Sequence, residues 1–229
     1  MPTARGPNER TPERLPRIPG ADRNAVRLVL DWDGTVTERD TLELVVERFG
    51  DIATYRRTGE LMGTGRLGHD EALALSFATV RAPLDEVVAW VVGAVRVRHG
   101  LGELTGRHRP LIVSSGFHEL IEPILAREEI EVPLLANRLD ARPDGWRIRF
   151  RPARRCRRCG ERCKRSALPP GDVAYVGDGY SDRCAALAAT RVFAIGGLAA
   201  YLDEQAVPYE PFEDLHDVAR ALAGEGSVR

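Results

Sequence analysis

The sequence predicts an α/β fold, a doubly wound parallel sheet with a small helical segment inserted after its first strand. Three observations lead to this prediction. Short apolar runs alternate with helical patterns along most of the chain, as they do in βα units. The runs at 26–31, 109–114 and 172–177 end in, or are followed directly by, an aspartate or a serine. The block 38–105 holds helical patterns and no convincing strand.

The first strand, 26–31, ends in a pair of carboxylates. Its aliphatic residues are typical of a strand buried in a parallel sheet, and such sheets bind ligands at their carboxyl edge. Asp31 and Asp33 are two residues apart, so an ideal strand places both on one face. Like charges this close repel each other, and the arrangement therefore requires a cation or a shared proton.

The block after this strand is expected to be helical. Residues 41–49 form an amphipathic pattern that stops at Gly50. Glycines then recur between 59 and 68, where we expect a loop. Residues 69–80 and 84–98 follow as two further helices.

The remaining elements complete the sheet and its covering helices. A half-exposed strand is expected at 146–150, because apolar residues alternate with arginines there. Strands are also expected at 109–114, 132–136, 172–177 and 191–195, and helices at 117–128, 197–205 and 213–223.

These elements divide the chain into three parts. We expect a disordered tail at 1–24, where five prolines and five arginines fall without an apolar pattern. Residues 25–37 and 106–229 are expected to form the core domain, and residues 38–105 a helical cap. A chain of 229 residues has room for one domain with such an insertion.

The composition argues against several classes of partner. The net charge of −1 gives no field that would attract nucleic acid, and no apolar stretch is long enough to span a bilayer. The first residues lack the apolar segment of a secretory signal, so the four cysteines are expected to be reduced or metal-bound. We therefore expect a cytoplasmic protein with no nucleic-acid or membrane partner, and the oligomeric state is not predicted.

Lys164 stands out because it is the single lysine in a chain with 33 lysines and arginines together. An ammonium group is a compact point charge, whereas a guanidinium is a wide planar fork. A site that holds a phosphoryl group beside a carboxylate has room for the ammonium only. Lys164 is therefore a candidate site residue, and the alternative is a surface lysine without a function.

Four segments, in order, resemble the motifs of the haloacid dehalogenase superfamily of phosphatases. The first motif, D-x-D-G-T-x-T, matches DWDGTVT at 31–37, and the second, an apolar strand ending in a hydroxyl, matches LIVSSGF at 111–117. Lys164 stands at the third motif, a lysine, and GDGYSD at 177–182 matches the fourth. The resemblance covers about residues 26–220. It implies a Rossmann-like core, a cap of the C1 type and hydrolysis of a phosphoric monoester.

The resemblance also implies a role for each motif residue. Asp31 is expected to be the nucleophile that forms an aspartyl-phosphate, and Asp33 the general acid and base. Lys164 is expected to complete this catalytic group. The phosphate oxygens are expected to be held by the Ser114 hydroxyl, by the backbone N–H groups of Ser115 and Gly116, and by Lys164.

Magnesium is the cofactor that the resemblance implies. A carboxylate can attack a phosphate only when both charges are screened, and Mg²⁺ prefers hard oxygen ligands. The expected ligands are the side chains of Asp31 and Asp178 and the backbone carbonyl of Asp33. Asp182 is expected either to orient a metal-bound water or to hold Lys164 in position without binding the metal itself.

The expected partner is a small phosphorylated substrate, and two branches of the superfamily suggest different ones. Asp40 stands where phosphoserine phosphatases carry a glutamate that binds the substrate amine. By rough alignment, Ser76 stands at the position of the arginine that binds the serine carboxylate in those enzymes. Arg66 and Arg81 lie nearby in sequence but do not match it.

The surroundings of Lys164 are more similar to another branch. The pattern Cys-Gly-x-x-Cys-Lys and the segment 201–218 resemble the methionine-salvage phosphatases, which act on a methylthiopentenyl phosphate. The substrate is therefore expected to be of one of these two kinds. Asp33 favours hydrolysis, because branches that keep their aspartyl-phosphate lack an acid at that position.

The cysteines leave a second hypothesis open. Cys156, Cys159 and Cys163 have C-x₂-C-x₃-C spacing, and with Cys184 they would provide four thiolates for Zn²⁺. Unligated reduced thiols are the alternative. The competing functions are accordingly a zinc-supported interaction module on a catalytically inactive fold, and phosphoryl transfer to an acceptor other than water.

Overall fold

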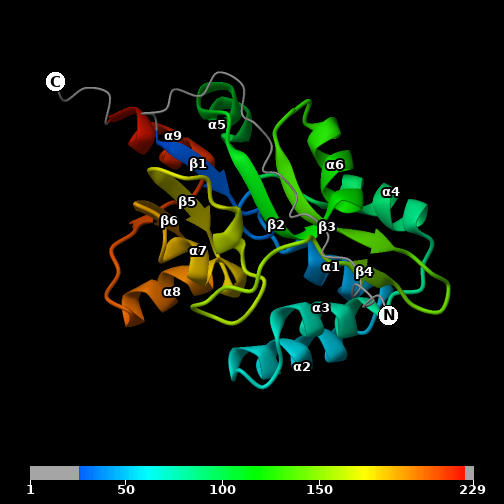
Figure 1. Cartoon of the computed structure of the whole chain (residues 1–229). Helices are drawn as coiled ribbons and strands as arrows, with labels where there is room; N and C mark the ends of the chain where they lie inside the picture. The colour runs from blue at the N-terminus through cyan, green and yellow to red at the C-terminus, as the bar shows by residue number, and fades with distance from the viewer. Residues whose placement is uncertain (1–25, 225–229) are drawn as a thin grey trace, which may run out of the picture.

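A seven-stranded sheet forms the centre of the computed structural model, which describes residues 26–224 (Figure 1). Its order is β4-β3-β2-β1-β5-β6-β7, and all neighbours are parallel except β3 and β4. The strands are β1 (Arg27–Leu30), β2 (Leu111–Phe117), β3 (Leu134–Asp140), β4 (Arg147–Arg149), β5 (Val173–Gly177), β6 (Arg191–Ala194) and β7 (Glu210–Pro211). The predicted α/β class is confirmed. The tail predicted at 1–24 lies outside the described residues.

Helices connect these strands and cover the sheet. They are α1 (Thr41–Phe49), α2 (Ile52–Gly63), α3 (His69–Phe77), α4 (Leu84–Ala94), α5 (Leu101–His108), α6 (His118–Arg127), α7 (Arg183–Ala186), α8 (Gly196–Glu204) and α9 (Leu215–Gly224). Two single-turn 3₁₀ helices, Lys164–Ala167 and Tyr180–Asp182, lie on either side of β5 in sequence. Within residues 26–224, no helix combines the length and the apolar character needed to cross a bilayer.

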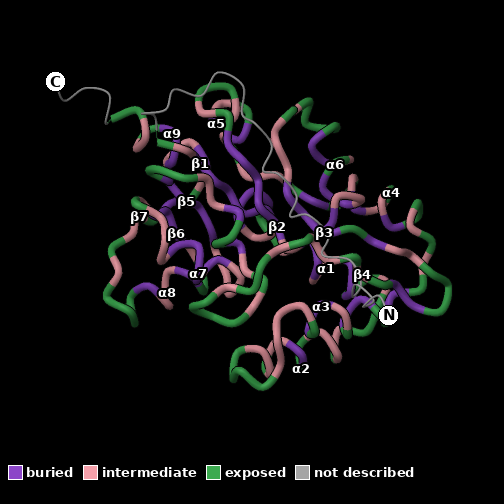
Figure 2. The backbone as a smooth tube through the Cα atoms, viewed as in Figure 1, coloured by how far each residue is buried: buried purple, intermediate pink, exposed green. Residues whose placement is uncertain are grey.

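The strand alternation explains why helices cover both faces of the sheet. Leu28 and Leu30 of β1 point into one apolar cluster, which also contains residues of α1, α4, α5, α6 and α9. Val29 of the same strand points into a second cluster with residues of α7 and α8. The inner strands are therefore buried on both sides, as Figure 2 shows, and the sheet is doubly wound.

The helices between β1 and β2 lie in two places. α4 packs against α6, and α5 packs against α9, so both contact helices that cover the sheet. α2 and α3 instead pack against each other and lie beyond the carboxyl ends of the strands (Figure 1). We call these two helices the α2–α3 pair. The extent of the cap at 38–105 stays a prediction.

Three local predictions differ from the structure. The helix expected at 84–98 ends at Ala94, and α5 at 101–108 was not predicted. The loop expected from the glycines at 59–68 is partly helix, because α2 extends from Ile52 to Gly63. Asp51 caps its first turn by accepting a hydrogen bond from the backbone N–H of Ala53 at 2.9 Å. A glycine inside a helix costs about 1 kcal/mol, and packing against α3 offsets that cost.

Candidate active site

The loop after β1 holds the first two acids in a tight turn. The N–H of Asp31 still donates to the carbonyl of Val176 on β5, at 2.9 Å, so this residue is fixed at the edge of the sheet. Gly34 has a φ of 74°, and a Cβ there would lie 2.3 Å from Oδ2 of Asp178. Only glycine permits both this backbone conformation and this close approach. The turn thereby brings Asp31, from the first motif, close to Asp178, from the last.

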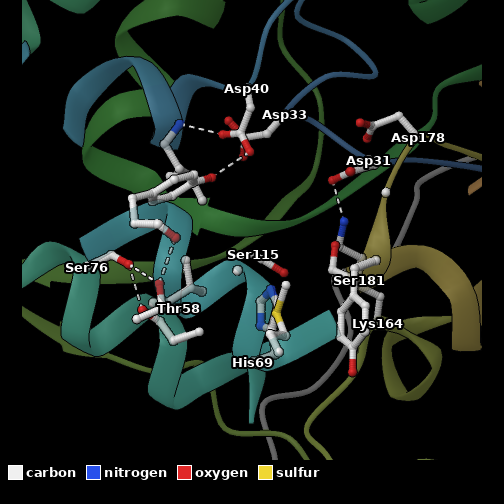
Figure 3. A pocket seen from close by; sticks show the side chains of 18 residues that line it. Asp31, Asp33, Asp40, Thr58, His69, Ser76, Ser115, Lys164, Asp178 and Ser181 are labelled. Carbon is white, nitrogen blue, oxygen red and sulfur yellow. Dashed lines mark hydrogen bonds and ion pairs between the residues drawn. The ribbon is translucent and has the colours of Figure 1, made fainter. Parts of the chain in front are cut away.

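Lys164 lies between two of the acids. Its ammonium nitrogen forms ion pairs with Asp31 and, at 2.7 Å, with Asp182, and all three side chains are buried (Figure 3 shows the Asp31 pair). Each of Asp31, Asp178 and Asp182 places an oxygen within 4.8 Å of the others. The structure thus brings together three acids and a lysine from segments that are far apart in sequence.

Asp182 has four hydrogen-bond donors around its carboxylate. Oδ1 accepts from Lys164 at 2.7 Å and from the Tyr175 hydroxyl at 2.6 Å. Oδ2 accepts from the backbone N–H groups of Asp178 at 3.0 Å and Gly179 at 2.9 Å. Burial opposes ionisation, but Lys164 and these donors hold the pKa of Asp182 below its usual range. Asp182 is therefore a fixed anion that orients Lys164.

Asp33 has a different environment. It accepts hydrogen bonds from the backbone N–H of Thr41 at 3.1 Å and from the Ser114 hydroxyl at 3.2 Å. Burial, together with the neighbouring carboxylate of Asp40, raises the pKa of Asp33 to about 7. A carboxyl group with such a pKa exchanges its proton near neutral pH, as a general acid and base must.

The end of β2 supports this carboxyl group. The hydroxyl of Ser114 accepts a hydrogen bond from the N–H of Gly116 at 2.7 Å while it donates to Asp33. A Cβ at Gly116 would lie 2.9 Å from Oδ2 of Asp33, so a larger residue would displace the acid. Asn137 donates to the carbonyl of Ser115 at 2.8 Å and accepts from the N–H of Arg151 at 2.9 Å. It thereby connects β2 to the segment that leads to Lys164.

A cavity of about 220 Å³ lies between these groups and the α2–α3 pair (Figure 3). Six residues predicted for the site line it, namely Asp31, Asp33, Asp40, Ser115, Lys164 and Asp178. The other three predicted residues, Ser114, Gly116 and Asp182, lie behind this wall and contact the lining residues.

The α2–α3 pair contributes further cavity residues, of which the sequence analysis named Ser76 alone. Tyr55 donates to Asp40 at 3.0 Å, while Asp40 also caps α1 by accepting from the N–H of Leu42 at 2.7 Å. Thr58 and Ser76 share a hydrogen bond of 3.0 Å across the two helices. The i, i+3 spacing of Tyr55 and Thr58 is typical of one helix face, but the glycines that follow them predicted a loop instead.

His69 is a further lining residue at the start of α3. Its ring stacks in parallel on that of Tyr180, with 6.4 Å between the ring centroids. Burial, together with the positive charge of Lys164, lowers the pKa of His69 to about 4. The imidazole is therefore neutral near pH 7 and offers a hydrogen bond to an uncharged group.

The donor set fits Mg²⁺. Three carboxylates, those of Asp31, Asp178 and Asp182, stand against the single ammonium group of Lys164, and a divalent ion neutralises the remaining two negative charges. Burial, with the charge of Asp182, raises the pKa of Asp31, so an additional cation is needed to keep Asp31 ionised. Oxygen donors are the ligands that Mg²⁺ prefers.

Comparison with known proteins gives consistent matches. The profile of a family described as haloacid dehalogenase-like hydrolase matches residues 28–187. A 2-hydroxy-3-keto-5-methylthiopentenyl-1-phosphate phosphatase of Brevibacillus brevis is 28% identical over 212 residues, which cover 85% of this chain and 94% of that protein. A phosphatase of the same description from Bacillus thuringiensis subsp. konkukian is 24% identical and covers 86% of this chain and 96% of its own.

A solved structure supports the fold. A phosphoserine phosphatase, determined as an analogue of its phospho-aspartyl intermediate, has a TM-score of 0.64 at 18% identity. The match covers 86% of this chain and 99% of that one. At this identity the likeness concerns the arrangement of helices and strands alone.

Proposed function

Because the chain belongs to the haloacid dehalogenase-like hydrolase family, we propose that it is a Mg²⁺-dependent phosphatase of a small phosphorylated metabolite. The curated relatives that it matches along most of its length are phosphatases. The acids and the lysine that this chemistry needs lie around one cavity. This arrangement favours catalysis over an inactive interaction module.

The proposed reaction begins at Asp31. One of its carboxylate oxygens attacks phosphorus, and the bond between phosphorus and the ester oxygen of the substrate breaks. Asp33 donates its proton to the leaving oxygen, which departs as an alcohol or enol. Lys164 offsets the negative charge that gathers between Asp31 and the phosphoryl oxygens.

Water completes the proposed cycle. Asp33, now ionised, removes a proton from a water molecule that attacks phosphorus, and the bond to Asp31 breaks to release inorganic phosphate. Mg²⁺, held by Asp31, Asp178 and the backbone carbonyl of Asp33, would supply positive charge beside the phosphoryl group. Asp182 would act in this scheme by orienting Lys164, which is the second of the two roles expected for it.

The charge of the cavity favours one substrate class. Among the described residues that line it, Lys164 is the single lysine or arginine, and it is already paired with two carboxylates. Neither Arg66 nor Arg81 reaches the lining, and Ser76 is bonded to Thr58. The carboxylate of phosphoserine would therefore be buried without a cation, which is unfavourable.

The rest of the lining suits a substrate that is uncharged beyond its phosphate group and has an apolar end. Leu42, Met62, Ala72 and Leu73 form an apolar wall, whereas Tyr55, Thr58 and His69 offer neutral polar groups. A sugar-like keto phosphate with a thioether tail presents matching groups. We therefore favour 2-hydroxy-3-keto-5-methylthiopentenyl-1-phosphate, the substrate in the names of the relatives, over phosphoserine.

Phosphate release from these two compounds, measured with and without Mg²⁺, tests the proposal. The keto phosphate should be preferred by at least about 100-fold in kcat/KM, because a buried unpaired carboxylate is rejected strongly. Asp31→Asn should abolish release, and Asp144→Asn, at an exposed turn, should leave it unchanged. Turnover by Asp31→Asn would refute the proposed nucleophile, and a preference for phosphoserine would refute the substrate class.

A further inference from the structure

Four thiols gather beside the candidate active site. The Sγ atoms of Cys156, Cys159, Cys163 and Cys184 all lie within 4.8 Å of one another, and those of Cys156 and Cys184 are 3.5 Å apart. In a tetrahedral zinc site with Zn–S bonds of about 2.3 Å, the sulfurs are about 3.8 Å apart. The four cysteines are free thiols, so no disulfide explains their convergence.

The loop that supplies the first two thiols is closed by backbone hydrogen bonds. Its ends are joined by hydrogen bonds from the N–H of Cys156 to the carbonyl of Glu161, at 2.7 Å, and from the N–H of Gly160 to the carbonyl of Cys156, at 2.8 Å. The backbone N–H of Arg158 points at the sulfur of Cys156, 3.4 Å away. Such N–H donors stabilise a thiolate that binds a metal.

The charge around the cluster is complementary to a zinc tetrathiolate. Four thiolates and one Zn²⁺ carry two net negative charges, and the segment 151–165 contains seven arginines. The segment that supplies three of the four ligands therefore carries charge of the sign opposite to that of the metal complex.

The cluster lies where it can fix the proposed phosphoryl-binding lysine. Cys163 directly precedes Lys164, and Cys184 lies two residues after Asp182. No helix or strand occurs between β4 and Lys164, so hydrogen bonds and side-chain contacts alone hold this described segment. A metal bound to both cysteines would tie Lys164 to its partner Asp182.

The same segment also contacts the α2–α3 pair. The N–H of His69, at the start of α3, donates to Glu161 at 3.1 Å. Arg162 forms an ion pair with Asp70 of α3 at 3.5 Å. Fixing the cysteine loop therefore also fixes one support of the helices that enclose the cavity.

We propose that Cys156, Cys159, Cys163 and Cys184 bind one structural Zn²⁺ ion that holds the segment carrying Lys164 in place. The four thiols lose their protons as they bind the ion, and no electron transfer is involved. Sulfur ligands with this geometry select zinc over Mg²⁺, so this site is separate from the aspartate cluster.

Metal analysis of the purified full chain tests the binding directly and does not depend on turnover. We expect one zinc per chain by plasma mass spectrometry, and strong sulfur-to-metal and d–d absorption when Co²⁺ replaces it. Iron in place of zinc would overturn the proposal. So would zinc far below one per chain, or a Cys156–Cys184 disulfide in mass spectra of the unreduced protein.

Variants assign the ligands. Cys159→Ser changes an exposed side chain and should lower zinc affinity by at least about tenfold, with far-UV circular dichroism retained. Arg157→Ala, an exposed residue between two ligands, is the matched control and should keep one zinc. Unchanged zinc affinity in Cys159→Ser, measured by competition with a chelator, would overturn the ligand set. The cobalt spectrum of the unmodified chain tests the site even if a variant fails to fold.

The positioning role rests on the proposed function and is tested last. After a chelator has removed both metals, Mg²⁺ alone should restore little phosphatase activity, and Mg²⁺ with one equivalent of Zn²⁺ should restore it in full. The α2–α3 pair should also become more sensitive to proteolysis without zinc. Full phosphatase activity and full resistance to proteolysis with Mg²⁺ alone would refute the positioning role. Whether the cysteines bind zinc is decided separately by the metal analysis.

Discussion

The ammonium nitrogen of Lys164 lies 2.7 Å from Oδ1 of Asp182, and both side chains are buried. The pair connects the segment before β5 to the segment after it. Since Lys164 also contacts Asp31, this ion pair determines where positive charge stands beside the proposed nucleophile.

Removing the charge of Asp182 should damage both stability and activity. Asp182→Asn leaves Lys164 buried with one anionic partner fewer, which typically costs about 3–5 kcal/mol. Urea unfolding and kcat measure the two effects, and we expect kcat to fall by at least about 100-fold. Tyr175→Phe removes only a neutral donor to the same oxygen and should cost about 1–3 kcal/mol. Equal losses of stability in Asp182→Asn and Tyr175→Phe would contradict the role of the Asp182 charge in holding Lys164.

Asp33→Asn should separate the two halves of the proposed reaction. The amide can still accept the hydrogen bond from the N–H of Thr41, but it cannot transfer a proton. We expect kcat to fall by about 10²–10⁴. With p-nitrophenyl phosphate, whose leaving group needs no proton, only the deprotonation of water is lost, so phosphorylated protein should accumulate, and intact mass spectrometry after an acid quench detects it. The double variant with Asp31→Asn is the control and should show no phosphorylation. Normal turnover in Asp33→Asn would exclude the role of Asp33 in proton transfer.

Gly34→Ala should disturb the aspartate cluster. An alanine at a positive φ costs about 1–2 kcal/mol, and its Cβ would lie 2.3 Å from Oδ2 of Asp178. We expect a lower Tm and a higher Mg²⁺ concentration for half-maximal activity. Gly93→Ala in α4 is the matched control, since its Cβ meets nothing within 4 Å. That change should stabilise the protein by about 0.5–1 kcal/mol. If Gly34→Ala needs no more Mg²⁺ than the wild type, the close approach of Gly34 to Asp178 does not affect the metal site.

His69 should make the stability depend on pH. The groups that face it are Lys164, Asp182, Tyr180 and, at its backbone, Glu161. Its pKa falls from 6.5 to about 4 on folding, so the unfolded chain binds the proton first as the pH decreases. The contribution of His69 is complete above the unfolded pKa and is lost between 6.5 and about 4.

The comparison with His69→Phe isolates this contribution, because other acids titrate equally in both proteins. Phenylalanine keeps a ring against Tyr180. The wild type should lose up to about 3 kcal/mol more than the variant across this pH interval in urea unfolding. Parallel stability curves for the two proteins would show that the imidazole is not held neutral.

The sequence predicted the parts of the fold that depend on local pattern. The apolar runs of β1 and β5 and the polar residues at the strand ends were sufficient to expect Asp31 and Asp178 at one edge of a parallel sheet. α2 was missed because Gly59 and Gly63 favour a loop locally, and packing against α3 outweighs that preference.

The contacts between distant segments could not be predicted in the same way. Cys184 is 21 positions after Cys163, and it joins the other thiols only because β5 returns the chain to the same edge of the sheet. Tyr55 and His69 reach the cavity only because of how the α2–α3 pair is arranged beyond the carboxyl ends of the strands. No local pattern encodes that arrangement, so the aspartates and Lys164 were more predictable than the cavity residues of the α2–α3 pair.

The hydrogen bond between Thr58 and Ser76 has a consequence for how this protein diversifies. It joins the two helices of the α2–α3 pair to each other, and neither residue contributes to the strand ends that hold the acids. Under the proposed function, residues of these two helices that face the substrate can be exchanged without altering Asp31, Asp178 or Lys164.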